Sequence, residues 1–164
     1  MVIGCPSMYM KGKRLHIQNP KLDVNSKVCF NSNVAASVPT RKFIKLKMKE
    51  FENHYFIGQV VNELRSIYLG APYEYKIEYN FRNVTDKIYQ DGRLRFFCNV
   101  PKWMEFLNDS DLTFGSRLHG NIAAVLAGTP ALLVTKDSRT RELAEYHHLN
   151  AIHESKLNEK LTLQ

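Results

Sequence analysis

The amino-acid sequence predicts an α/β domain built on a doubly wound parallel sheet. Short apolar runs alternate with segments of helical apolar spacing, turn residues separate the two, and 164 residues suffice for one hydrophobic core. Strands that alternate with helices along a chain pair in parallel through helical crossovers. In such sheets ligands bind beyond the carboxyl ends of the strands, so functional residues are expected in the turns that follow strands.

Apolar spacing places most elements of the first two thirds of the chain. Strands are expected at residues 28–30, 55–61 and 93–100, and helices at residues 39–51, 62–69 and 101–107. Helix 39–51 carries Phe43, Ile44, Met48 and Phe51 at helical spacing, with lysines on its other face. Residues 73–92 alternate tyrosines with charged residues and predict a half-exposed strand or an insertion.

Residues 111–139, DLTFGSRLHGNIAAVLAGTPALLVTKDSR, form a strand–turn–helix–strand unit. An apolar run at 112–114 ends at Gly115-Ser116, and helical spacing begins at Arg117. Gly128 and Pro130 end this helix before a second apolar run at 131–134, and a further helix is expected at 139–148. The unit is the usual way to build a parallel pair of strands.

The turn after the first of these strands has the composition of an anion site. Ser116 is expected to cap the helix, which puts Arg117, Leu118 and His119 in its first turn. Backbone N–H groups are unpaired there and the helix dipole is positive, so an arginine, a histidine and free amides suit an anion. The turn at 135–139 also follows a strand, so both turns are expected at one edge of the sheet.

Charge is distributed unevenly along the chain. Of 23 Lys and Arg against 16 Asp and Glu, residues 1–52 hold ten basic and three acidic residues, which accounts for the whole net charge of +7. This pattern favours an anionic partner, such as an acidic glycan, a membrane face or an acidic domain, or else a solvated lysine face. Nucleic acid is not indicated, because no basic motif interleaved with aromatics is present.

Composition also bounds location and metal content. The longest apolar window, residues 122–134, is broken by glycine and proline and is too short to span a bilayer, and residues 1–10 lack the features of a secretory signal. Three widely spaced cysteines without a C-x-x-C predict free thiols in a reducing compartment, so the expected location is the cytoplasm, including the inner face of the membrane. His147, His148 and His153 lack a metal-ligand spacing, so no metal site is expected.

The words GSRLHGNIAAVLAGTPALL and DSRTREL resemble the polysaccharide pyruvyltransferase family, whose members carry G-x-R-x-H-G and then A-G-x-P. The resemblance implies one half of a GT-B-like fold, in which two Rossmann-like domains face a cleft. It implies transfer of the enolpyruvyl unit of phosphoenolpyruvate onto sugar hydroxyls as a ketal, with no metal or other cofactor. Gly4-Cys5-Pro6-Ser7 matches the segment that closes the family's first half. Residues 1–26 are therefore expected to be a junction left from a missing N-terminal half, and residues 27–164 the donor-binding domain.

The resemblance places the family's phosphoenolpyruvate-contacting R-L-H on Arg117, Leu118 and His119. His119 is the expected proton donor, since imidazole titrates near neutrality, and Arg117 the expected clamp for carboxylate and phosphate. Leu118 is expected to act through its backbone N–H, with its side chain in the core. The remaining substrate-binding candidates are Gly115, Ser116, Gly120, Asn121 on the polar side of the helix, and Arg139.

Several neighbouring residues have competing interpretations. Arg141 is expected to pair with Glu145 at i+4, and Asp137 and Ser138 to cap their helix. Lys136 stands where family members often have histidine and is assigned no role. Gln59 and Glu63, expected to end a central strand at the same edge, are candidates for sugar contact. Trp103 is expected in the core.

The sequence favours a pyruvyltransferase acting on a cell-surface polysaccharide or exopolysaccharide precursor. Its partners would be phosphoenolpyruvate, a sugar acceptor, and a second copy or a separately encoded first half. One alternative is a nucleotide-sugar-dependent glycosyltransferase-like domain, although no acidic ribose-binding residue follows the helix. The other is a non-catalytic remnant, because a fold without a complete site does not imply function.

Overall fold

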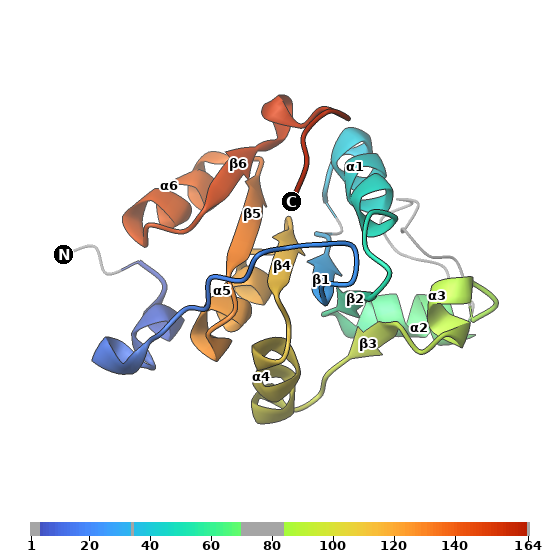
Figure 1. Cartoon of the computed structure of the whole chain (residues 1–164), viewed down its shortest axis with the longest axis horizontal. Coiled ribbons are helices and arrows are strands. Elements are labelled where there is room, and N and C mark those ends of the chain that lie inside the picture. The colour runs from blue at the N-terminus through green and yellow to red at the C-terminus, as the bar shows by residue number, and fades with distance from the viewer. Residues whose placement is uncertain (1–3, 34, 70–83, 164) are drawn as a thin grey trace.

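The computed structural model describes residues 4–33, 35–69 and 84–163 (Figure 1). Within these residues the strands form one sheet in the order β3-β2-β1-β4-β5-β6, and every neighbouring pair is parallel. The strands are β1 (Val28–Asn31), β2 (His54–Gly58), β3 (Leu94–Phe96), β4 (Leu112–Gly115), β5 (Ala131–Thr135) and β6 (Ala151–His153). The predicted doubly wound parallel sheet is confirmed. Its strand order reverses between β1 and β4, where ligands bind in such folds.

Helices cover both faces of this sheet. They are α1 (Val38–Met48), α2 (Val61–Leu69), α3 (Lys87–Gln90), α4 (Val100–Asn108), α5 (Leu118–Ala127) and α6 (Ser138–Tyr146), with 3-10 turns η1 (Pro6–Tyr9), η2 (Gly12–Arg14) and η3 (Glu154–Lys156). Figure 1 shows α1 and α6 near one end of the sheet and α4 near the other. None of the helices in the described ranges is long and apolar enough to cross a membrane.

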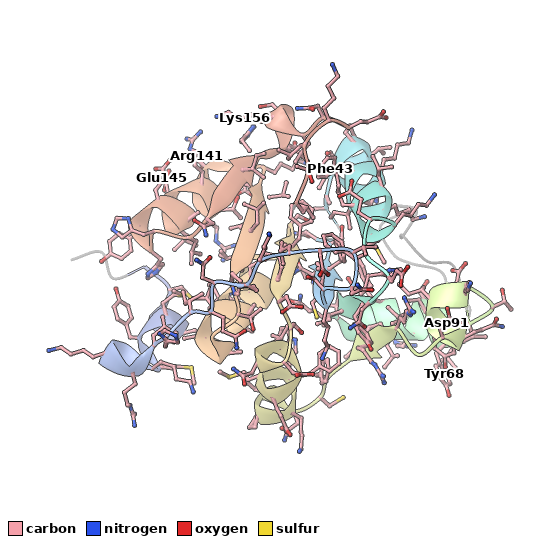
Figure 2. The ribbon with its side chains drawn as sticks, in the orientation of Figure 1. Phe43, Tyr68, Asp91, Arg141, Glu145 and Lys156 are labelled. Atoms are coloured by element: carbon pink, nitrogen blue, oxygen red, sulfur yellow. The ribbon has the colours of Figure 1, made fainter. Side chains whose placement is uncertain are left out.

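The side chains of each strand point alternately to the two faces of the sheet and form a hydrophobic core on each face. Phe30 and Phe56 are fully buried in a cluster with residues of α1 and α2, whereas Cys29 and Ile57 pack with residues of α4 and α5. Successive side chains of a strand point to opposite faces, so each strand supplies both cores. Phe43 of α1 lies between its helix and the sheet (Figure 2), and its ring packs at a tilt against Phe114 of β4, with 5.9 Å between ring centroids. The predicted apolar face of this helix is confirmed.

Some predicted boundaries were wrong. The second strand ends at Gly58 rather than 61, because α2 begins at Val61, and the third pairs with β2 over three residues only. The strand β6 was not predicted, since three residues at a sheet edge leave little periodic signal. Lys47 does not join the solvated lysine face of α1: it is 2% exposed and pairs with Glu50 at 2.6 Å. Of residues 73–92, the tyrosine-rich part up to 83 lies outside the described residues, and residues 87–90 are helical.

The described part of the N-terminal segment packs against the last third of the chain. The Cys5 N–H donates to Nε2 of His147 at 2.7 Å, and the Gln18 N–H donates to the Gly128 carbonyl at 2.8 Å. Met8 packs against the apolar side of α5. These contacts tie the segment to the end of α5 and α6.

Candidate active site

The turn between β4 and α5 begins where the strand order reverses. Gly115 pairs with Asn31 of β1 so closely that a side chain at Gly115 would collide with the Asn31 carbonyl. The helix starts at Leu118, with Arg117 in extended conformation as its N-cap, so the expected capping role of Ser116 is wrong. Ser116 Oγ instead accepts the Asn33 N–H at 2.8 Å, because the helix begins one residue late and Ser116 faces the loop after β1.

Arg117 connects three loops at this edge. Its backbone N–H donates to Oδ1 of Asn31 at 2.8 Å, its Nε donates to the Ser32 carbonyl at 2.8 Å, and its Nη2 pairs with Oε1 of Glu63. Burial lowers the pKa of the Arg117 guanidinium to about 10, so the group stays protonated at neutral pH. The guanidinium expected to clamp a ligand is therefore already engaged with the protein, and 15% of the side chain is exposed.

Glu63 is the buried partner of this arginine. It lies in the first turn of α2 with 0% exposure, and its Oε2 accepts the N–H groups of Gln59 at 2.8 Å and Val60 at 3.3 Å. The expectation that Glu63 ends a strand and contacts a sugar is wrong, because both carboxylate oxygens are occupied inside the protein. A buried carboxylate needs such a partner, since an unpaired buried charge is strongly unfavourable.

The residues after His119 support the turn from within. Asn121 is 1% exposed, and its Nδ2 donates to the carbonyls of Gly115 at 3.1 Å and Arg117 at 2.8 Å. Its expected place on the polar side of the helix is therefore wrong, because the side chain points inward and donates to these two buried carbonyls. Gly120 is needed for space, since a side chain there would collide with the Gln59 amide. The Leu118 side chain is buried in a core cluster, as predicted.

His119 is the exposed member of the motif. It lies in the first turn of α5, and in the described part of the chain it forms no hydrogen bond to another residue. The first amides of a helix have no acceptor within it, and the helix dipole favours negative charge at this end. An imidazole beside such amides can bind an anion and exchange a proton with it.

The turn between β5 and α6 lies at the same edge, as predicted. Asp137 caps α6, its Oδ1 accepting the Thr140 N–H at 2.8 Å, and this bond holds the carboxyl pKa below its ordinary value. Lys136 Nζ donates to the Ala35 carbonyl in the loop after β1 at 3.0 Å. Arg139 is exposed on the first turn of α6.

Arg141 and Glu145 lie one turn apart on the solvent side of α6 (Figure 2), with 3.9 Å between Nε and Oε1. The predicted ion pair is confirmed.

A cavity of about 190 Å³ opens between the loops that follow β1, β4 and β5. It is lined by Asn33, Ala35, Ala36, Thr40, Ser116, Val134, Lys136, Asp137, Thr140 and Glu154. Oε2 of Glu154 accepts the hydroxyls of Ser37 at 2.8 Å and Thr40 at 2.9 Å, which fixes this carboxylate in the wall. Of the predicted site residues, Ser116 lines the cavity, whereas Arg117, His119 and Arg139 do not.

Two structural partners of the site were not found from the sequence. Asn31 and Ser32 are almost completely buried and hold Arg117, although in the sequence they resemble ordinary turn residues at the end of β1. Their signal was positional, because polar residues directly after a buried strand face the ligand edge of a parallel sheet. Among the described residues no cluster of His, Cys, Asp and Glu has the arrangement of a metal site.

The fold and this edge define a Rossmann-like domain with the N-terminus of helix α5 at its switch point. The chain belongs to the polysaccharide pyruvyl transferase family, whose sequence model matches residues 1–138, and it is therefore a domain of a transferase family. No curated protein matches the sequence significantly.

Among solved structures, one described as "Crystal Structure Analysis of the Glycotransferase of kitacinnamycin" has a TM-score of 0.47 and 12% sequence identity. The match covers 90% of this chain and 35% of the other, so this chain spans about a third of that protein's length.

Proposed function

We propose that this domain binds phosphoenolpyruvate at the carboxyl edge of its sheet and delivers the pyruvyl unit to two hydroxyls of a sugar as a ketal. The acceptor would be a cell-surface polysaccharide or its precursor. The observation that carries this proposal is His119: an exposed histidine in the first turn of α5, without a hydrogen-bond partner among the described residues, in a chain of this family.

The reaction requires an acid and later a base. His119 donates a proton to the CH₂ carbon of phosphoenolpyruvate, which becomes a methyl group and leaves an oxocarbenium at C2. One sugar hydroxyl attacks C2 and loses its proton to a base. The bond from C2 to the phosphate oxygen then breaks, inorganic phosphate leaves, and a second hydroxyl of the same sugar takes its place and loses its proton. The products are the ketal and phosphate.

Charge at the edge suits the donor's carboxylate and phosphate. In this proposal Arg139 and the α5 amides, including that of Leu118, bind the anion. Gly115, Ser116, Gly120 and Asn121 give the turn its shape. Arg117 contributes positive charge from its partly exposed side chain while it remains bound to Glu63.

Calorimetric titration of the purified chain with phosphoenolpyruvate tests the donor site. We expect saturable binding that His119→Ala weakens about tenfold or more, as for a lost hydrogen bond to a charged group. His16→Ala is the matched control, because His16 is also exposed but lies beside Gly128, at the opposite end of α5. Uridine diphosphate is titrated in parallel. Preference for uridine diphosphate, or equal binding by wild type and His119→Ala, would overturn the proposal.

A further inference from the structure

A second cavity, of about 100 Å³, lies at the same edge of the sheet and is lined by Ile57, Gly58, Gln59, Phe97 and Trp103. Gly58 ends β2 and Phe97 directly follows β3, so the cavity lies beyond the carboxyl ends of these two strands. Trp103 comes from the first half of α4. None of these residues takes part in the proposed donor site.

The cavity adjoins that site through one side chain. The Gln59 amide packs against Gly120, the residue after His119, so closely that no side chain fits there. The backbone N–H of Gln59 is held by Glu63, which in turn binds Arg117. The Gln59 side chain therefore contacts both the cavity and Gly120, the residue next to His119 in the sequence.

One side of the cavity is an aromatic surface. The Phe97 and Trp103 rings are stacked, with 6.5 Å between centroids and an interplanar angle of 11°. Phe97 also packs against Phe106 of α4 at 5.3 Å between centroids. These contacts fix the Phe97 and Trp103 rings in the cavity wall. Aromatic rings of this kind offer the apolar surface against which the C–H groups of a sugar ring pack.

Two of the residues that line the cavity also carry donors without acceptors. In the described part of the chain, Nε2 of Gln59 and Nε1 of Trp103 are buried and have no hydrogen-bond partner. Buried N–H groups are almost always paired, because an unpaired one costs its full desolvation energy. Both groups donate, so the missing partners are acceptors, and the cavity has room for more than one oxygen.

We infer that this cavity is a subsite for one pyranose ring of the sugar acceptor, which packs on Phe97 and Trp103 and accepts hydrogen bonds through its hydroxyl oxygens from Gln59 and Trp103. That the bound sugar is the acceptor rests on the proposed function. The binding of a sugar ring itself does not depend on phosphoenolpyruvate.

Trp103 is the single tryptophan of the chain, so intrinsic fluorescence reports this cavity directly. The probes are methyl β-galactopyranoside and methyl α-mannopyranoside, with sorbitol as the open-chain polyol control and uridine as the nucleoside control. We expect a saturable change in Trp103 emission with at least one pyranoside and none with sorbitol or uridine. Gln59→Leu should weaken binding about fivefold or more, as for one lost hydrogen bond, whereas Gln90→Leu, an exposed glutamine at the end of α3, should not.

Thermal unfolding of each variant confirms that it is folded, and Phe97→Leu, which removes the stacked ring, tests the same cavity if Gln59→Leu does not fold. No saturable change with either pyranoside overturns the inference, as does a response that both Gln59→Leu and Phe97→Leu leave unaltered, or an equal response to sorbitol or uridine. Because phosphoenolpyruvate is absent from these titrations, failure here leaves the donor site standing, and failure of the donor titration leaves the sugar subsite standing.

Discussion

The two turns that follow β4 and β5 carry similar residue types but are built in opposite ways. In the first, Arg117 is bound to Asn31, Ser32 and Glu63, and its neighbours are buried. In the second, Lys136 and Arg139 are exposed, and the carboxylate of Asp137 is used to cap its own helix. The first turn is fixed by contacts far apart in the sequence. The second is capped by contacts within four residues, and its exposed Lys136 donates a long-range bond to the Ala35 carbonyl.

This difference assigns to separate residues two roles that the sequence alone gives to Arg117: holding the turn in place and binding an anion. A guanidinium bound at several atoms loses little further entropy when a ligand arrives, but its donors are already in use. An exposed arginine is free to bind an anion but must be ordered to do so. The β4–α5 turn is therefore a fixed frame around His119, whereas the β5–α6 turn carries exposed positive charge.

The largest expected effect comes from breaking the buried pair. Glu63→Ala should lower the free energy of unfolding by about 3–5 kcal/mol, because it leaves the Arg117 guanidinium buried without its partner. Urea unfolding followed by circular dichroism measures this. The double variant Glu63→Leu, Arg117→Met replaces both charges by apolar groups and should recover much of the loss. A cost below about 1 kcal/mol for the single variant would show that the pair does not hold the loops.

A smaller effect is expected from the buried amide of Asn121, which donates to two carbonyls of the β4–α5 turn. Asn121→Leu should cost about 1–3 kcal/mol, because it removes the donor to the Gly115 and Arg117 carbonyls from a buried site. Asn62→Leu, at an exposed position of α2, is the matched control and should stay within about 0.5 kcal/mol. Equal midpoints of urea unfolding for the two variants would contradict a bracing role for Asn121.

The local contacts of the second turn should contribute less and depend on pH. Asp137→Ala should cost about 1 kcal/mol at pH 7 through loss of the N-cap. The folded-state pKa of Asp137 is lowered by the Thr140 hydrogen bonds, so the stabilisation is fully present above the unfolded value of about 4 and is lost as pH falls through the folded value. The stability difference between wild type and variant should therefore be constant from pH 7 to about pH 5 and shrink below pH 4. A difference that grows on acidification would reverse the assignment.

The contrast between the turns also explains what the sequence could predict. Strand and helix periods and the Gly128 stop depend on neighbours within a few residues, and they placed both turns at one edge correctly. The partners of Arg117 depend on the register of β1 against β4 and on α2 folding back over the edge. Glu63 is 54 residues from Arg117, and nothing in local spacing links them.

Asn121 shows the same limit at short range. A polar residue type predicts a solvent-facing position on α5. The helix is buried almost all round, however, and the Asn121 amide donates to two carbonyls inside the protein. Sequence periodicity cannot distinguish a polar residue that faces solvent from one that satisfies buried carbonyls.

The smallest stability effects, and the clearest functional contrast, are expected from two arginines on α6. Arg139→Ala and Arg141→Ala should each change the free energy of unfolding by no more than about 0.5 kcal/mol, since both side chains are exposed and the Arg141–Glu145 pair is a surface pair. Their effects on phosphoenolpyruvate binding should differ, because Arg139 lies in the first turn of α6 and Arg141 is paired with Glu145. Calorimetry should show affinity reduced about tenfold by Arg139→Ala and unchanged by Arg141→Ala, the former corresponding to one lost charge-assisted hydrogen bond. Equal affinities in the two variants would mean that Arg139 does not bind the donor. The cationic partner of phosphoenolpyruvate would then be Arg117, released from Glu63.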